Sequence, residues 1–493
     1  MARALTTGRP WRVIVAFSVP LLIGNVVQQA YQIADAAVVG RSLGVTSLAA
    51  VGATSSFIFL LLGFAWGMTS GFAIPTAQAF GAGDDRAVRR SVAAGAILSA
   101  AASVVITAVA PLLAEPMLHL LGTPAELVSE AKTFAVVSFL GAATMMFFNF
   151  LAAILRAIGD SRTPLYFLVL SCVLNIGLVV LAVPVLDMGV GGAALATVIS
   201  QGCAALACFW HVHHNVPALH VNREDWRVTR AELLEHLRLG LPMGFQMSII
   251  AIGMIAIQVR LNELGPDAVA AYTTAARVDN VPLAFLGSMG IATSMFAAQN
   301  LGARRTDRIR KGVPQALLVT CVGSVVVGLL VATQGTTLVR LFVGSGEDDV
   351  VAMAAYFLLV NGSLYALLLA PLFVLRGALQ GLGYASIPTI TGTLELGCRV
   401  LAAAVLGAVW GFNGVVWGNP LAWLAALVVL IPAYVHAHRR LDGIRSRVTT
   451  MAEPEPVRAA EPEPARAEAC SSGSAMRGSA ESGATPLAEP VNA

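Results

Sequence analysis

Charged residues are scarce in this chain of 493 residues. Asp, Glu, Lys and Arg together make up 12% of the sequence, whereas 57% of the residues are hydrophobic. Soluble domains carry roughly 25% charged residues, and a water-soluble fold cannot bury so much apolar surface. The composition therefore predicts a protein that lies within a membrane.

Long apolar runs recur along the first 440 positions, and each is long enough to cross a hydrocarbon core of roughly 30 Å as a helix. They do not alternate apolar and polar residues as the strands of a membrane barrel do. The sequence thus predicts an all-α membrane protein with twelve transmembrane helices. The runs lie near residues 13–39, 48–79, 91–114, 132–154, 164–186, 189–212, 238–262, 268–300, 313–334, 351–376, 387–409 and 414–437.

Lysine is almost absent, which argues against a nucleotide-driven pump. The phosphate-binding loop of such a pump ends in Gly-Lys followed by Ser or Thr. The two lysines, Lys132 and Lys311, stand in no such context. Transport then depends on an ion gradient or runs downhill, unless a partner supplies ATP. Five of the six cysteines lie in apolar segments without metal-ligand spacing, so no metal or cofactor is predicted.

Basic residues collect in the loops on one side of the predicted membrane, and Arg156 and Arg376 are counted among them. Because such residues stay in the cytoplasm, we expect both termini inside and a multi-pass protein of the inner (plasma) membrane. From about Thr449 the chain turns to Ala, Glu, Pro and Ser, a composition typical of disorder.

The two halves of the chain repeat each other. Adding 221 to Gln78 and Gly81 gives Gln299 and Gly302, and with small gaps Pro164 matches Pro388. A repeat of six helices places both copies in the same orientation, which suits alternating access by rocking. We expect a first lobe at 1–215, a cytoplasmic linker at 216–237, a second lobe at 238–445 and a disordered tail at 446–493.

Polar residues interrupt the apolar runs at helical spacing. In the first run, Asn25, Gln28, Gln32 and Asp35 follow spacings of 3, 4 and 3 and share one helix face, with Tyr31 beside them. The amides suit either interhelical packing or a cavity. An ionisable residue such as Asp35 is costly in a membrane unless it faces a cavity or a partner, so a functional role is favoured for it.

Further polar residues in both halves leave structural and functional interpretations open. In the second half, Glu395 and Arg399 are four residues apart and can form a pair along one helix face. Arg277 and Asp279 are two apart, so at least one needs a partner on another helix. Each of the remaining four is alone compatible with simple helix packing: Asn149, Asn175, Thr197 and Gln201.

Six sequence phrases in this order resemble the MATE (multidrug and toxic compound extrusion) transporters, over residues 10–440. They are PLLIGNVVQQAYQIADAAVVGRSLGVTSLAAVG from residue 20, AQAFGAGD, LRAIGDSRTP, GGAALAT, AQNLGARR and LQGLGYASIP. The resemblance implies a V-shaped pair of lobes and a cation-coupled antiporter, not an enzyme, that exports amphipathic, often cationic compounds. It also implies a monomer.

The resemblance carries functional residues over to this chain. It implies ion coupling by Asp35, Tyr31, Asn175 and Thr197, with Val179 where the family has a second acid. It gives Ile250, Tyr365 and Leu369 at the sodium site of the NorM-like branch, which favours the DinF-like side and protons over Na⁺. We assign ten residues to a substrate cavity: Asn25, Gln28, Gln32, Asn149, Gln201, Arg277, Asp279, Tyr365, Glu395 and Arg399.

Three alternatives remain. A major-facilitator transporter would carry a loop that Gly81, Asp85, Arg86, Arg89 and Arg90 nearly reproduce, although Val88 replaces its internal glycine. A flippase for lipid-linked or polyisoprenoid compounds usually has additional helices. A membrane receptor or scaffold that signals through the tail would need the tail but not Asp35.

Overall fold

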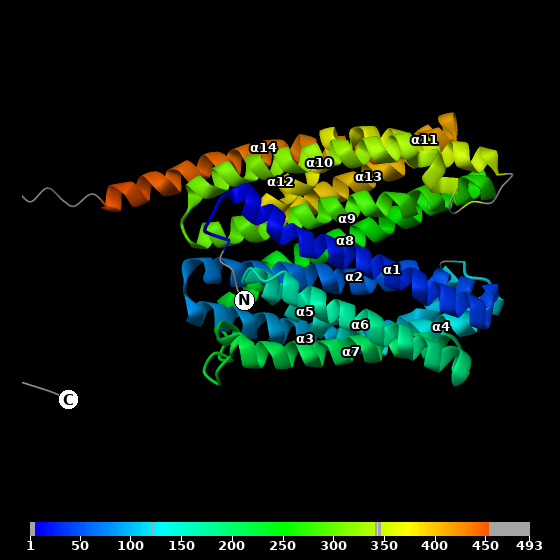
Figure 1. Ribbon diagram of the computed structural model, residues 1–493, viewed down its shortest axis with the longest axis horizontal. Helices are drawn as coiled ribbons and strands as arrows, with labels where there is room; N and C mark the ends of the chain where they lie inside the picture. Colours follow the sequence, from blue (N-terminus) through cyan, green and yellow to red (C-terminus); the bar gives the residue numbers. More distant parts are fainter. Residues whose placement is uncertain (1–4, 121, 341–342, 344–346, 453–493) are drawn as a thin grey trace, which may run out of the picture. The chain divides into compact units, whose positions relative to one another are not determined.

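Helices make up the regular structure of the described part of the chain, which comprises residues 5–120, 122–340, 343 and 347–452 of a computed structural model (Figure 1). The first half contains α1 (Pro10–Leu43), α2 (Val45–Ala82), α3 (Asp85–Leu120), α4 (Ala125–Leu140), α5 (Ala142–Ala157), α6 (Arg162–Val180), the π-helical turn η1 (Leu181–Val185) and α7 (Gly189–Asn215). The short η2 (Pro217–Leu219) follows. The second half contains α8 (Arg230–Leu264), α9 (Pro266–Gly302), α10 (Thr306–Arg340), α11 (Asp348–Leu364), the π-helical turn η3 (Tyr365–Leu369), α12 (Ala370–Gly381), α13 (Ser386–Trp410) and α14 (Phe412–Ala452).

The helices have the length and apolarity that a bilayer requires. Among the described residues, 11 spans pass this test, and α4 with α5 would make one more as a pair bent by 49°. The twelve predicted segments agree with this arrangement when the bent pair counts as one span. The break falls at Gly141, where an added Cβ would collide with the side chain of Val198 on α7. Close packing of α7 thus favours glycine at the bend.

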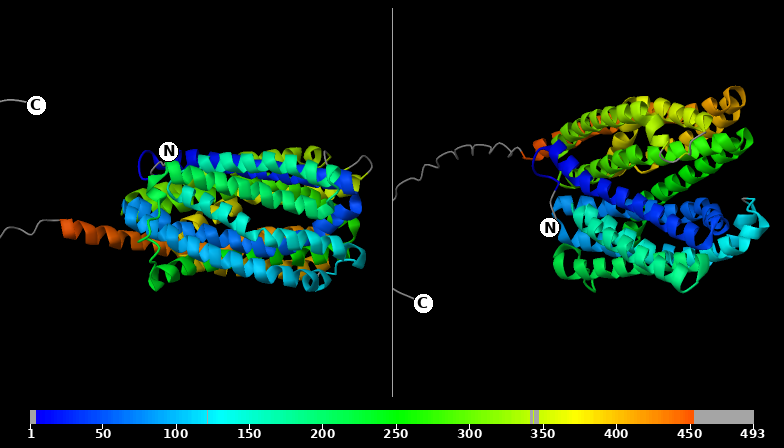
Figure 2. Two further views of the ribbon diagram at one scale, coloured as in Figure 1. Left: turned by 90° about the horizontal axis from the view of Figure 1, so that it is seen from below. Right: turned by 45° about the vertical axis from the view of Figure 1, so that its right-hand side comes forward.

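Residues Met1–Ser446 form one unit of the chain. Within it, α2 to α7 lie on one side and α8 to α14 on the other, while α1 runs between the two groups (Figures 1 and 2). The first turns of α1 contact α10, where the Trp11 N–H donates to Gln315 Oε1 at 3.3 Å. Near its other end, Val39 packs with Val179 and Val183. α1 therefore bridges the two groups.

The two groups are joined most closely along α2 and α8. The backbones approach so tightly that a Cβ on Gly71 would reach the backbone of Leu239 and Gly240 at 2.6–2.9 Å. Further along, the Ser248 hydroxyl donates to Leu60 O at 3.2 Å. Small residues that let helix backbones approach are typical of contacts within membranes, where no hydrophobic driving force acts between helices.

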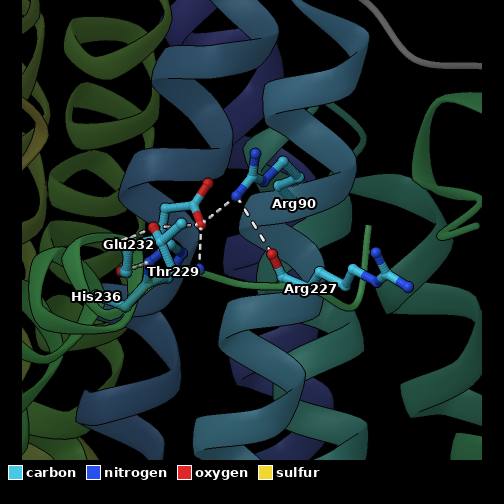
Figure 3. Close-up of polar contacts among 5 residues, drawn as sticks. All are labelled: Arg90, Arg227, Thr229, Glu232 and His236. Carbon is cyan, nitrogen blue, oxygen red and sulfur yellow. Dashed lines mark hydrogen bonds and ion pairs between the residues drawn. The ribbon is translucent and has the colours of Figure 1, made fainter. Parts of the chain in front are cut away.

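The segment between the halves is fixed to α3 by ion pairs (Figure 3). Arg90 on α3 contacts Glu232 Oε2 at 2.8 Å and also donates to Arg227 O at 3.4 Å. Glu232 is at the same time part of the capping box that begins α8 at Thr229. One turn later, the buried His236 bonds to the Ser91 hydroxyl at 2.9 Å. The start of α8 is thereby attached to the first half.

Two predicted boundaries differ from those of the structure. α8 begins at Arg230, so residues 230–237 of the expected linker are helical. At the other end, α14 continues to Ala452, beyond the expected start of disorder near Thr449. Residues 453–493 of the predicted tail lie outside the described residues.

Candidate functional site

A cluster of polar side chains joins α1, α6 and α7 in the first half. The Asn175 amide donates to Thr197 Oγ1 at 3.0 Å, and the Tyr31 hydroxyl lies 3.3 Å from the same oxygen. Thr197 in turn donates to Ala193 O of its own helix at 3.2 Å. Asp35 stands one helical turn beyond Tyr31 on α1. The structure thus joins Tyr31, Asn175 and Thr197 by hydrogen bonds, and Asp35 follows one turn later on α1.

Two oxygens of this cluster have unmet hydrogen-bonding capacity. Asp35 Oδ1 and Asn175 Oδ1 are buried and have no hydrogen-bond partner in the described part of the chain. Both are acceptors. A buried carboxylate without a counter-charge is stabilised by taking up a proton or a cation. The cluster therefore has the composition of a site for a proton or a small cation.

Apolar side chains pack against the far end of the cluster. Val179, one turn beyond Asn175, is fully buried with Val39 and Val183. A second acid in place of Val179 would lie among these valines without a partner. Val179, which stands where the resemblance implies a second acid, therefore lies in apolar surroundings that suit a valine. Asp35 is the carboxylate that remains.

A pocket adjoins the cluster in the first half. Polar and apolar side chains share its walls, as they do in sites for small organic molecules. Asn25, Gln28, Tyr31, Asn149 and Gln201 line it, as do apolar side chains such as Trp66, Phe148 and Leu168. Of the residues predicted for a cavity in this half, Gln32 alone is missing from its walls. Asn25 also donates to Ser288 Oγ of α9 at 3.2 Å, so it has a packing contact as well.

Arg156 also lines this pocket. The positive-inside pattern counts Arg156 among the cytoplasmic basic residues, and the structure has it in the last turn of α5, only partly exposed. The apolar run preceding it ends near residue 154, so hydropathy alone could not show that the side chain turns into the pocket.

The second-half residues predicted for the cavity do not line this pocket. The buried Asp279 on α9 accepts a hydrogen bond from the Tyr365 hydroxyl, so this acid has the partner on another helix that the sequence demands. Arg277, two residues earlier, is exposed. Tyr365 opens the π-helical turn η3, and Leu369 closes it. π-Helical turns inside helices frequently occur at functional sites.

Glu395 on α13 lies between two guanidinium groups. Arg376 on α12 donates directly to Glu395 Oε1, and Arg399 lies one turn along α13 with its Nη2 3.8 Å from Oε2. The predicted pair of Glu395 with Arg399 is therefore present but is the longer of the two contacts. Arg376, counted among the cytoplasmic basic residues, is 7% exposed within the helical bundle. Its partner comes from another helix, so spacing along the sequence gave no sign of it.

The MatE family model matches the chain twice, at residues 20–181 and 242–405. The chain belongs to the MATE family. The two matches, one in each half, agree with the internal repeat read from the sequence.

Two curated relatives illustrate the similarity of the MATE chain to known proteins. The probable multidrug resistance protein YpnP of Bacillus subtilis is 31% identical over 380 residues, which cover 77% of this chain and 84% of the relative. The multidrug export protein MepA of Staphylococcus aureus is 25% identical over 430 residues, covering 86% of this chain and 94% of the relative. The chain is thus a multi-pass membrane transporter and not an enzyme.

Solved structures share the fold. A multidrug resistance MATE transporter in an outward-facing conformation matches with a TM-score of 0.80 at 24% identity, covering 90% of this chain and 98% of that one. A MOP superfamily transporter from Pyrococcus furiosus matches with a TM-score of 0.81 at the same identity and coverage. At this identity, the likeness shows the fold.

In this MATE chain, two glutamines join the halves at the ends of α2 and α9. Gln78 donates to Gly381 O at 3.1 Å, and Gln299 donates to Ala157 O at 2.6 Å. The donors are 221 residues apart and the acceptors 224 apart, so each half makes the same bond to the other. Gln299 also accepts from the Leu5 N–H at 2.8 Å. The repeat identified these glutamines as equivalent but gave no reason to expect contact.

Glycines permit this approach. A Cβ on Gly81 would overlap the backbone of Gln299, and a Cβ on Gly302 would overlap that of Gln78. Any larger residue would push the two halves apart at this end. The four residues form what we call the glutamine seal: Gln78, Gly81, Gln299 and Gly302.

Proposed function

We propose that this protein is a proton-coupled antiporter that exports amphipathic organic compounds by alternating access. The observation that carries the proposal is the buried, unpartnered Asp35 oxygen, one helical turn beyond the Tyr31–Thr197–Asn175 cluster and near a pocket with mixed polar and apolar walls. The names of YpnP and MepA, a probable multidrug resistance protein and a multidrug export protein, support export of organic compounds.

The proposal also includes the orientation of the chain in the membrane and its conformational state. The predicted cytoplasmic side is the end that holds Leu5 and the glutamine seal, with both termini inside. A seal at this end is what an outward-facing state requires. We retain the division into lobes at 1–215 and 238–445 and a monomeric protein. Ile250 and Leu369, which stand at the acid positions of the NorM-like sodium site, support placement on the DinF-like side.

The coupling step follows from the chemistry of the cluster. In the outward-facing state, a proton binds Asp35 and removes its charge. The neutral acid then packs against Val39 and Val179, which favours movement of α1. Each proton that moves inward gains about 2.3 kcal/mol per 100 mV of membrane potential, so the exchange is biased toward export.

The test uses the full chain in liposomes with an imposed pH or Na⁺ gradient and a panel of amphipathic dyes. Asp35→Asn mimics the protonated acid, so gradient-driven export should fall to the level of empty liposomes while dye binding at equilibrium is retained. Asp267→Asn, at an exposed acid in the first turn of α9, is the matched control and should export normally. Proton-driven export by Asp35→Asn would overturn the mechanism, and export driven only by Na⁺ would replace the proton with Na⁺.

A further inference from the structure

The pocket has an unusual charge for a carrier of organic cations. Among the described residues that line it, Arg156 is the only charged one, and the other polar walls are amides, hydroxyls and a thiol. No ion pair or hydrogen bond of the Arg156 guanidinium is found in the described part of the chain. A cationic ligand in this pocket would be repelled by the positive charge of Arg156 and would find no carboxylate to bind.

The nearest acids along the chain are directed elsewhere. Asp160 does not line the pocket, because its carboxylate accepts from the N–H groups of Arg162 and Thr163, both at 3.0 Å, and from the Thr163 hydroxyl at 2.7 Å. It thus serves the first turn of α6. Asp35 lies one turn beyond Tyr31 and is also absent from the lining.

The acids buried in the second half are likewise occupied. Asp279 accepts a hydrogen bond from Tyr365, and Glu395 contacts both Arg376 and Arg399. Neither acid lines the pocket. Arg156 is thus the charged group that a ligand in the pocket meets, and its sign attracts an anion.

We propose that the exported compound carries a negatively charged oxyacid group, a carboxylate, sulfonate or phosphate, that binds Arg156. This inference rests on the proposed function, since it names the substrate class of the same pocket. The planar guanidinium suits bidentate binding of an oxyacid. The apolar body of the ligand lies against Trp66, Phe148 and Leu168, and the amides of Asn149 and Gln201 bind its other polar groups.

An anionic substrate also suits the energetics of the cycle. A membrane potential that is negative inside drives protons inward and anions outward. The potential therefore favours both movements when a proton is exchanged for an anion. When a proton is exchanged for an organic cation, the potential favours entry of the proton but opposes exit of the cation. We expect export of the anion to accelerate when an inside-negative potential is imposed with potassium and valinomycin.

The test compares one fluorescent amphiphile in three forms, with a carboxylate, its methyl ester or a trimethylammonium group. Binding to the full chain in nanodiscs is measured by fluorescence anisotropy. We expect the carboxylate to bind about tenfold more tightly than the ester, the factor that a charged hydrogen bond provides. Arg156→Gln should abolish that preference, and Arg156→Lys should keep most of it.

A second variant guards against a folding defect, because Arg156 also lies in the last turn of α5. Gln201→Glu is nearly isosteric and adds a negative charge to the same wall, so it should weaken carboxylate binding about tenfold without weakening binding of the trimethylammonium form. Tightest binding of the trimethylammonium form by the unmodified protein overturns the inference. So does a carboxylate preference unchanged in Arg156→Gln or, if that variant does not fold, in Gln201→Glu.

The outcome also separates this inference from the proposed function. Gradient-driven export of the cationic form, unaffected by Arg156→Gln, would leave the antiporter standing and remove the anionic substrate. Carboxylate binding at Arg156 without gradient-driven export of any form would do the reverse.

Discussion

Replacing Glu395 provides the most direct test of the buried charges in the second half. Glu395→Gln removes the one negative charge between Arg376 and Arg399, whose side chains are 9% and 16% exposed. The Nε atoms of both arginines are buried without hydrogen-bond partners in the described structure. Loss of the carboxylate leaves two like charges facing each other in a site of low dielectric. Breaking a buried pair in this way typically costs about 3–5 kcal/mol.

The geometry also predicts an order among the single variants. Arg376→Gln should cost less than Glu395→Gln, because Arg399 remains to compensate the carboxylate. Arg399→Gln should cost least, since its contact with Glu395 is the longer one at 3.8 Å and its removal also eliminates the excess positive charge. The double variant of Glu395→Gln with Arg376→Gln should be less damaged than the sum of the two singles.

Unfolding in a titration with SDS, followed by circular dichroism, measures these differences. Glu263→Gln is the matched control, because Glu263 pairs with Arg260 at an exposed position and should cost about 1 kcal/mol or less. The reasoning fails if Glu395→Gln is no worse than Glu263→Gln. It also fails if the double variant shows the full sum of the single losses.

Other contacts give further predictions. Gln78→Ala with Gln299→Ala should shift the resting protein toward the inward-facing state, which a cysteine-accessibility assay at the cytoplasmic end detects; unchanged accessibility would refute the glutamine seal. Gly302→Ala should do the same alone, because its Cβ overlaps the Gln78 backbone; normal export and accessibility would contradict this. The Asn222 N–H and the Arg89 guanidinium lower the pKa of Asp225, so its stabilising charge is present above its ordinary pKa and lost as the pH falls through the lowered value. Asp225→Asn should therefore lower the thermal midpoint at roughly pH 7, and this loss should shrink as the pH falls through the lowered pKa. An equal loss at every pH would refute the assignment.

Hydropathy predicted the spans well because the bilayer imposes a length on every helix. The same reasoning could not find the bend at Gly141 or the π-helical turns, since these depend on neighbours such as Val198 rather than on local composition. The internal repeat predicted which residues are equivalent. It did not predict that Gln78 and Gln299 contact the opposite halves, because a sequence repeat carries no information about the distance between its two copies.

Charged residues show the limit of sequence reasoning more sharply. Asp35 stood out because its apolar run, residues 13–39, contains no basic residue to neutralise it. The structure leaves one of its oxygens without a hydrogen-bond partner in the described part of the chain. Arg156 and Arg376 were counted among the cytoplasmic basic residues, since each lies at the end of an apolar run. Arg376 is held by a carboxylate on another helix, and Arg156 faces a pocket, so each has an environment that its own segment does not reveal.

The distribution of charge argues that the two halves have diverged in role from a common repeat. The second half gives its buried acids internal partners, a hydrogen bond from Tyr365 for Asp279 and an ion pair with Arg376 for Glu395. The first half has Asp35 with an unpartnered oxygen and places Arg156 in a pocket wall, so its charges remain available to exchangeable partners. An ion and a substrate that use the same half can influence each other through α1, which lines the pocket with Asn25 and carries Asp35. The second half, with its acids already paired, then supplies the stable surface against which α1 and the first half move.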